Sequence, residues 1–119
     1  MSTDIWPSEI RLDPAKTTLT VAFENGDRFQ LPAEYLRIES PSAEVQGHAA
    51  AQKVTVGGKK NVKITGLEPV GNYAVRILFD DGHDTGLYSW DWLHELGRDR
   101  NKKWAAYLKS LGAQGLTRE

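Results

Sequence analysis

The chain has 119 residues and a mass of 13.3 kDa, enough for one domain and too little for two independent hydrophobic cores. Its formal net charge is −1, so it lacks the positive charge typical of proteins that bind nucleic acid or an anionic membrane surface. It contains no cysteine, which excludes disulfides, thiolate zinc sites and cysteine nucleophiles.

The sequence also favours a cytoplasmic location. No apolar run approaches the ~20 residues that cross a membrane. Residues Met1–Pro7 show neither the basic start nor the apolar stretch of a secretory signal. We therefore expect a single domain over residues 1–119 that has no nucleic-acid or membrane partner.

The first third of the chain predicts a β-hairpin. Glu9–Leu12 alternates polar and apolar residues like a short strand, and Thr17–Phe23 places three apolar side chains on one face. Asn25-Gly26 then indicates a tight turn. A two-residue loop would put the next strand's apolar side chains on the wrong face. We therefore predict a three-residue loop, Asn25–Asp27, that pairs Phe23 with Phe29 and Val21 with Leu31.

The middle of the chain predicts a short helix and further strands. Pro32 is suited to the first turn of a helix over Ala33–Arg37, which ends at Ser40-Pro41-Ser42. Brief strands are expected at Val54–Val56 and Val62–Leu67. Tyr73–Phe79 has the clearest strand pattern, with Tyr73, Val75, Ile77 and Phe79 on one face.

The second half repeats the first at an offset of 56 residues. Phe23-Glu-Asn-Gly26 recurs as Phe79-Asp-Asp-Gly82, and Leu31 recurs as Leu87. Ser89 is a plausible N-cap for a helix over Trp90–Leu96. The overall prediction is an α+β fold of antiparallel hairpins, in a small twisted sheet or sandwich, with short helices.

A C-terminal helix is expected over residues 101–112, because Trp104, Leu108 and Leu111 share one helical face. Residues 113–119 are predicted to form a frayed tail.

The densest polar cluster is Asp80-Asp81-Gly82-His83-Asp84. An imidazole flanked by carboxylates could bind a divalent metal such as iron or zinc. Asp-Gly is also ordinary turn chemistry, and neighbouring loop side chains cannot all face one ion, so the turn interpretation is favoured. A small hydrolase or isomerase using Asp80, His83 and Asp84 ranks last, because no nucleophile or oxyanion element can be named.

The tryptophans on either side of Asp91 have two interpretations as well. In a helix Trp90 and Trp92 point to different sides, so one is expected in the core. The other could be an exposed anchor for a protein partner.

Two longer runs carry a family resemblance. They extend from Leu36-Arg37 to His48, through Ser40-Pro41-Ser42, and from Val70 to Trp90. Together they resemble the N-terminal domain of gamma-butyrobetaine hydroxylase and a bacterial family of unknown function named after it. The resemblance covers about residues 7–96, and Arg37 within the first run is a candidate binding residue.

The resemblance implies a zinc site that this chain lacks. In the hydroxylase, three cysteines and one histidine hold a structural zinc. The cysteine positions fall here at Ser40, Ser42 and Val45, and the histidine falls at His83. Hydroxyls are poor zinc ligands at neutral pH and valine offers none. If these positions once faced one ion, the loop from Ser40 to Val45 should lie near the Asp81–His83 turn.

Two functions from different classes follow. The first is a non-catalytic interaction module, acting through a protein partner and needing no cofactor. Similar domains are fused to ATPases that carry iron–sulfur clusters, which suggests a partner in iron or iron–sulfur metabolism. The alternative is a small metal-binding protein that holds iron or zinc through His83, nearby carboxylates and His48. No oxygenase activity is expected, because no catalytic domain follows Leu96.

Overall fold

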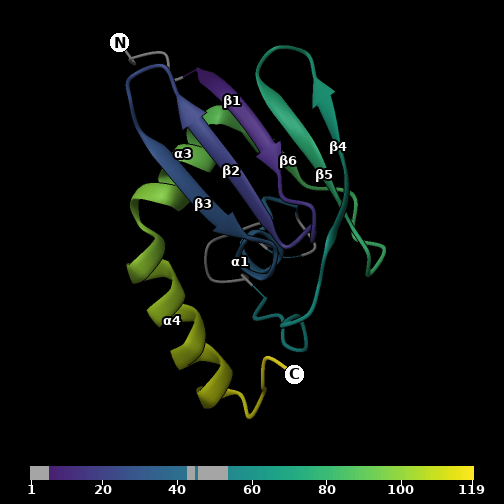
Figure 1. Cartoon of the computed structure of the whole chain (residues 1–119). Coiled ribbons are helices and arrows are strands. Elements are labelled where there is room, and N and C mark those ends of the chain that lie inside the picture. Colours follow the sequence, from purple (N-terminus) through teal and green to yellow (C-terminus); the bar gives the residue numbers. More distant parts are fainter. Residues whose placement is uncertain (1–5, 43–44, 46–53) are drawn as a thin grey trace.

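Two small antiparallel sheets frame the protein. The computed structural model describes residues 6–42, 45 and 54–119. Within these residues, the first sheet has the strand order β1 (Pro7–Leu12), β2 (Thr18–Phe23), β3 (Arg28–Pro32). The second has the order β4 (Ile64–Val70), β5 (Ala74–Phe79), β6 (Leu87–Ser89). The two sheets lie side by side (Figure 1), and the predicted α+β class with antiparallel hairpins is confirmed.

The first hairpin has the predicted loop length and a different register. Val21 pairs with Phe29, and Leu19 pairs with Leu31. The predicted pairing of Val21 with Leu31 is therefore wrong by two residues. The loop is Glu24–Gly26, closed by a bond from the Phe23 N–H to the Asp27 carbonyl. Gly26 has φ +97°, and a glycine is favoured at the last position of such a loop, which fixes the register.

The second hairpin repeats this turn. The Phe79 N–H donates to the His83 carbonyl, and Gly82 has φ +88°. After the turn the pairing shifts by one residue, so that Val75 faces Tyr88. Tyr88 is fully buried and Leu87 is 43% exposed, so the equivalent of Leu31 is Tyr88 rather than the predicted Leu87.

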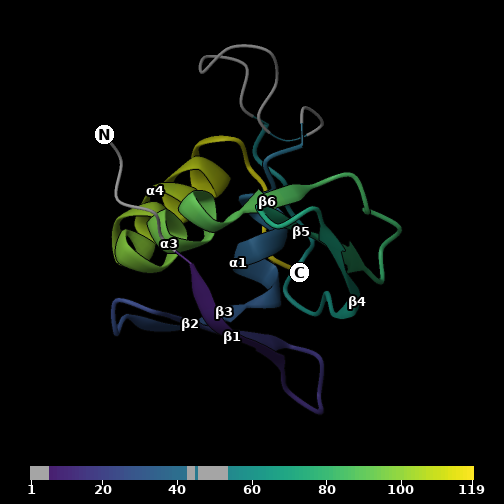
Figure 2. The same cartoon turned by 90° about the horizontal axis from the view of Figure 1, so that it is seen from above.

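Three helices among the described residues surround the core. α1 (Ala33–Ile38) follows β3, α3 (Trp90–Arg98) follows β6, and α4 (Arg100–Ala113) continues from α3 after Asp99. Seen from above, α1 lies between the two sheets and α3 lies beside the first (Figure 2). The core is built from the inner faces of both sheets and from all three helices, with fully buried side chains that include Leu19, Leu31, Leu36, Ile64, Ile77, Tyr88 and Leu93.

Several predicted side-chain positions differ. In α4 the buried residues are Tyr107 and Leu111, whereas Leu108 is 43% exposed. Tyr73 lies before β5 and is 55% exposed, so it does not share the buried face of that strand. Val54–Val56 is not a strand.

The end of the chain is docked rather than frayed. The carbonyls of Thr117 and Arg118 accept hydrogen bonds from the Gly58 and Lys60 N–H groups, at 2.9 Å each. The guanidinium of Arg118 binds both carboxylate oxygens of Glu34 in α1, at 2.8 and 2.9 Å. These bonds tie the tail to two distant segments. In the described part of the chain, no helix has the length and apolar character needed to cross a membrane.

Candidate functional site

The end of α1 meets the turn of the second hairpin. The hydroxyl of Ser40 lies 2.8 Å from Nε2 of His83, although 43 residues separate them in the chain. Both side chains are buried, at 0% and 6% exposure. The predicted proximity of this loop to the hairpin turn is therefore confirmed.

A second layer of contacts surrounds that pair. The hydroxyls of Ser42 and Thr85 lie 2.8 Å apart. The hydroxyl of Tyr88 donates to the Leu36 carbonyl at the end of α1. Burial raises the pKa of Tyr88, so this hydroxyl stays protonated and acts as a donor at neutral pH. The hairpin and the helix end thus form one buried polar contact.

Asp81 is the charged member of this region. Its carboxylate accepts from Arg37 Nε at 2.8 Å, from Lys59 Nζ at 2.6 Å and from the His83 N–H at 3.1 Å. Burial raises the pKa of Asp81, but the Lys59, His83 and Arg37 donors outweigh burial and lower it to about 2. Asp81 is therefore a firmly ionised partner of two cations and is not suited to be a general acid or base at neutral pH.

The other two acidic residues of the cluster contact other segments of the chain. Asp80 is exposed, and one of its oxygens accepts from the Lys63 N–H at 3.1 Å. Asp84 is also exposed, and its carbonyl lies 3.4 Å from Arg76 Nη1. The three carboxylates of the sequence cluster do not converge on His83. Within residues 6–42, 45 and 54–119, no group of three potential metal ligands is close enough to hold an ion. His48 lies outside the described residues.

The residues that the resemblance places at zinc-ligand positions do not fit zinc. Ser40 contacts His83 Nε2 directly, so the hydroxyl and the imidazole nitrogen bond to each other instead of facing a shared ion. Val45 is buried and offers no ligand atom. The Ser40–His83 hydrogen bond links the segment after α1 directly to the second hairpin.

The two candidate tryptophans have similar environments. Trp90 Nε1 donates to the Asn72 carbonyl at 2.8 Å, and Trp92 Nε1 donates to the Glu39 carbonyl at 3.1 Å. Both are half-buried, and Lys103 Nζ lies 4.9 Å above the Trp92 ring. The prediction of one core and one exposed tryptophan is therefore wrong, because each ring is anchored by its N–H at the core boundary.

The first hairpin makes a matching contact with α3. His94 Nε2 lies 2.6 Å from a carboxylate oxygen of Asp27, and the His94 ring packs edge-on against Phe23 and Phe29. Asp27 stands at the same place in its turn as His83 does in the second. No sequence pattern predicted this pair, and none predicted the contacts of Lys59, Thr85 and Tyr88. The 56-residue repeat was the signal that could have located Asp27.

Solved structures of similar proteins share this fold. One NMR solution structure is 47% identical, with a TM-score of 0.84 and a match over 98% of this chain and 92% of that chain. A second is 45% identical, with a TM-score of 0.85 over 100% and 89%. A crystal structure of a protein of unknown function from Acidithiobacillus ferrooxidans, of the DUF971 family, is 34% identical, with a TM-score of 0.63 over 76% and 91%.

No curated protein matches the chain. The family model described as "Gamma-butyrobetaine hydroxylase-like, N-terminal" matches residues 10–94, well over half of the sequence. The relatives in this fold include a protein of unknown function, and no recognised catalytic family matches. The protein belongs to the family of gamma-butyrobetaine hydroxylase-like N-terminal domains.

Proposed function

We propose that this protein is a non-catalytic interaction module that acts by binding a partner protein. The observation that carries the proposal is that polar side chains of the Asp80–Asp84 turn are bonded to other parts of the fold. His83 is bonded to Ser40, and Asp81 is bonded to Arg37 and Lys59. A catalytic base or nucleophile must reach a substrate, whereas these groups hold two segments of the fold together.

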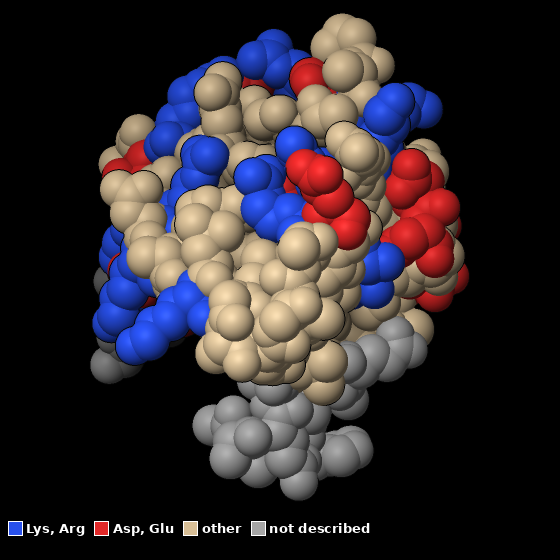
Figure 3. Space-filling model, turned by 90° about the horizontal axis from the view of Figure 1, so that it is seen from below, with Lys and Arg blue, Asp and Glu red and all other residues tan. Residues whose placement is uncertain are grey.

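The distribution of charge supports a protein partner. Residues 98–119 contain six basic and two acidic side chains, which gives this segment a net charge of +4. The whole chain has a net charge of −1, so residues 1–97 carry a net charge of −5. On the face shown in Figure 3, basic side chains predominate on the side of α4, and a group of acidic side chains lies on the side of β4 and β5 with basic ones beside it. A surface divided in this way orients and selects a partner whose charges are complementary.

Affinity capture tests the proposal. The tagged full-length chain, cross-linked in native extract, should retain one protein reproducibly, and the two purified proteins should bind each other. The resemblance predicts that this partner belongs to iron or iron–sulfur metabolism. If no purified protein binds directly, the interaction module is the wrong function.

The metal-binding alternative predicts different results. It requires stoichiometric iron or zinc in the purified protein, a lower melting temperature in excess chelator, and loss of metal in His83→Ala. We expect none of these results. Nε2 of His83 is hydrogen-bonded to Ser40, and the described carboxylates form no group that could hold a metal ion. A chelator-induced drop of several degrees in wild type would favour the metal-binding protein.

A further inference from the structure

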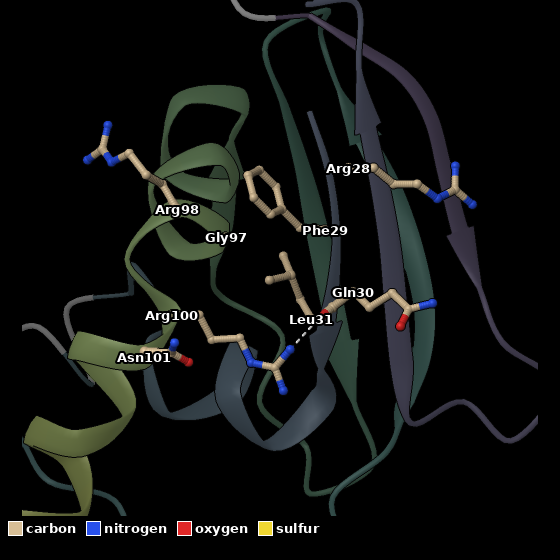
Figure 4. Close-up of a pocket in the computed structure, with 8 residues that line it drawn as sticks. All are labelled: Arg28, Phe29, Gln30, Leu31, Gly97, Arg98, Arg100 and Asn101. Carbon is tan, nitrogen blue, oxygen red and sulfur yellow. Dashed lines mark hydrogen bonds between the residues drawn. The ribbon is translucent and has the colours of Figure 1, made fainter. Parts of the chain in front are cut away.

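A groove of about 470 Å³ runs beside β3. One wall is formed by residues Arg28–Leu31 of this strand, and the other by Gly97, Arg98, Arg100 and Asn101 at the junction of α3 and α4. In Figure 4 the Phe29 and Leu31 side chains point from the strand toward the helices. The floor is therefore apolar, and the open side exposes a sheet edge.

The exposed backbone groups of β3 can be identified from the turn. The Phe23 N–H binds the Asp27 carbonyl, and the Ala33 N–H binds the Thr17 carbonyl. Because hydrogen-bonded pairs alternate along an antiparallel ladder, Phe29 and Leu31 bond to β2. The N–H and carbonyl groups of Arg28 and Gln30 therefore point away from the sheet. They are the groups that an added strand would use.

One of these outward groups is already bound by a side chain. The Gln30 carbonyl accepts from Arg100 Nη1 at 2.9 Å, across the groove. No described residue accepts a hydrogen bond from the Gln30 N–H. Arg100 thus occupies the place of the donor that a neighbouring strand would supply, and an incoming N–H can replace it.

The charge at the groove indicates the chemistry of the occupant. Three of its eight lining residues are arginines and none is acidic. Arg28 and Arg98 lie on opposite sides of the groove, and their side chains extend away from it, that of Arg28 over β1 (Figure 4). Among the described residues their carboxylate partners are Glu9 and Asp99, which are both partly exposed. Exposed pairs of this kind contribute little, so these arginines can exchange their partners for carboxylates of a ligand.

From the edge, the apolar floor and the arginines, we propose that an extended acidic segment of a partner protein binds in this groove by adding a strand to β3. The inference rests on the proposed function and specifies where the partner docks. Main-chain bonds to Arg28 and Gln30 hold the segment, and its carboxylates bind the arginines. The four strand residues in the wall span roughly 13 Å, enough for a segment of four to six residues.

A designed peptide provides the first test. The probe is a blocked six-residue peptide in which glutamate and valine alternate, titrated into the ¹⁵N-labelled full-length protein. The amides of Arg28 and Gln30 should shift, and hydrogen exchange of the Gln30 amide should slow because a new bond protects it. The same peptide with lysine in place of glutamate should bind at least about five-fold more weakly, because it repels the arginines.

Variants separate the main-chain bonds from the charges. Gln30→Pro removes the outward N–H and leaves the bonds between β2 and β3, so we expect roughly five-fold weaker binding. If this variant does not fold, N-methylation of the peptide on its pairing side removes the same bonds in wild type. Arg98→Gln should weaken binding about three-fold. Arg11→Gln is the matched control, because Arg11 is 61% exposed on β1 and Arg98 is 60% exposed.

The outcomes distinguish this inference from the proposed function. Binding without protection of the Gln30 amide, or equal binding of the lysine peptide, would overturn strand addition. If a captured partner binds wild type and the Gln30 and Arg98 variants equally, the groove is not its docking site, although the protein remains an interaction module. If no partner binds, the proposed function itself fails.

Discussion

His83 lies in a hairpin turn, yet its ring bonds to a hydroxyl 43 residues earlier in the chain. Ser40 is fully buried, so neither group has water as an alternative partner. In such surroundings a polar group that loses its partner keeps the cost of its own burial. The pair therefore stabilises the contact between α1 and the hairpin only while both members are present.

A double-mutant cycle measures that contact. Ser40→Ala and His83→Ala should each lower the free energy of unfolding by roughly 1–3 kcal/mol. The coupling between them should be about 1 kcal/mol, measured by denaturant unfolding. Asn25→Ala paired with His83→Ala is the control, because Asn25 bonds to Asp27 in the turn of the other hairpin and should not couple. Zero coupling between Ser40 and His83 would mean that their hydrogen bond contributes nothing to stability.

The lowered pKa of Asp81 should make the free energy of unfolding depend on pH. Its pKa in the folded protein is about 2, below the ordinary value of 3.8. A carboxyl whose pKa is lowered by folding adds stability above its unfolded pKa and loses it as the pH falls through the folded pKa. Wild type should therefore lose stability between about pH 4 and pH 2. Asp81→Asn should be less stable at pH 7 and should lose less over that window, as followed by urea unfolding at each pH.

At the scale of the elements, helix α3 packs very closely on strand β3. A Cβ atom added at Gly97 would lie 2.2 Å from the Phe29 ring, which is too short for a contact between non-bonded atoms. Glycine is normally unfavourable inside a helix. Here the close approach of the helix to an aromatic ring requires it.

Two glycine substitutions test this packing. Gly97→Ala should lower the stability by roughly 1–3 kcal/mol, because the ring or the helix must move. Gly112→Ala in α4 adds the same methyl group where no atom lies within 4 Å. It should be neutral or stabilise by up to about 1 kcal/mol. Thermal and chemical unfolding of the two variants check the contrast, and similar effects from both would contradict the packing argument.

The elements themselves could largely be predicted from the sequence. Alternation located β2 and β5, and Ser89 caps α3 as expected, since its hydroxyl accepts from the Trp92 N–H at 3.1 Å. The register of the first hairpin could not be predicted. The predicted register and the observed one both keep the apolar residues of the hairpin on one face, and only the placement of Gly26 in the loop decides between them.

The candidate site could be predicted only in part. The proximity of Ser40 and His83 followed from the family resemblance. The roles of Lys59 and Arg37 depend on tertiary contacts with Asp81 that no local pattern records. The three carboxylates near His83 are close in sequence, but among the described residues they form no group that could hold a metal ion, so their spacing alone was a poor guide to a metal site.

At the scale of the whole molecule, the tail after α4 is bound to α1, the first helix. Arg118 binds Glu34, whose side chain is only 8% exposed. The Trp104 ring lies 5.3 Å from the same guanidinium. The last residues of the chain thus neutralise a buried charge in α1.

Removing that guanidinium should be costly. Arg118→Ala leaves the Glu34 carboxylate buried without its cation, and we expect a loss of roughly 2–4 kcal/mol in the free energy of unfolding. Lys60→Ala is the matched control, because its partner Glu119 is 77% exposed and the pair should contribute less than about 1 kcal/mol. Denaturant unfolding of both variants gives the comparison. Equal small losses would mean that the tail is not held by this ion pair.

The two turns contact each other's helices, Asp27 with His94 in α3 and His83 with Ser40 after α1. Each half of the chain therefore lends a helix to the other, as two subunits do in a domain-swapped dimer. Neither half can close its core alone, so the chain should fold in one cooperative step. These contacts join residues 67 and 43 positions apart, which makes folding slow for a chain of this size.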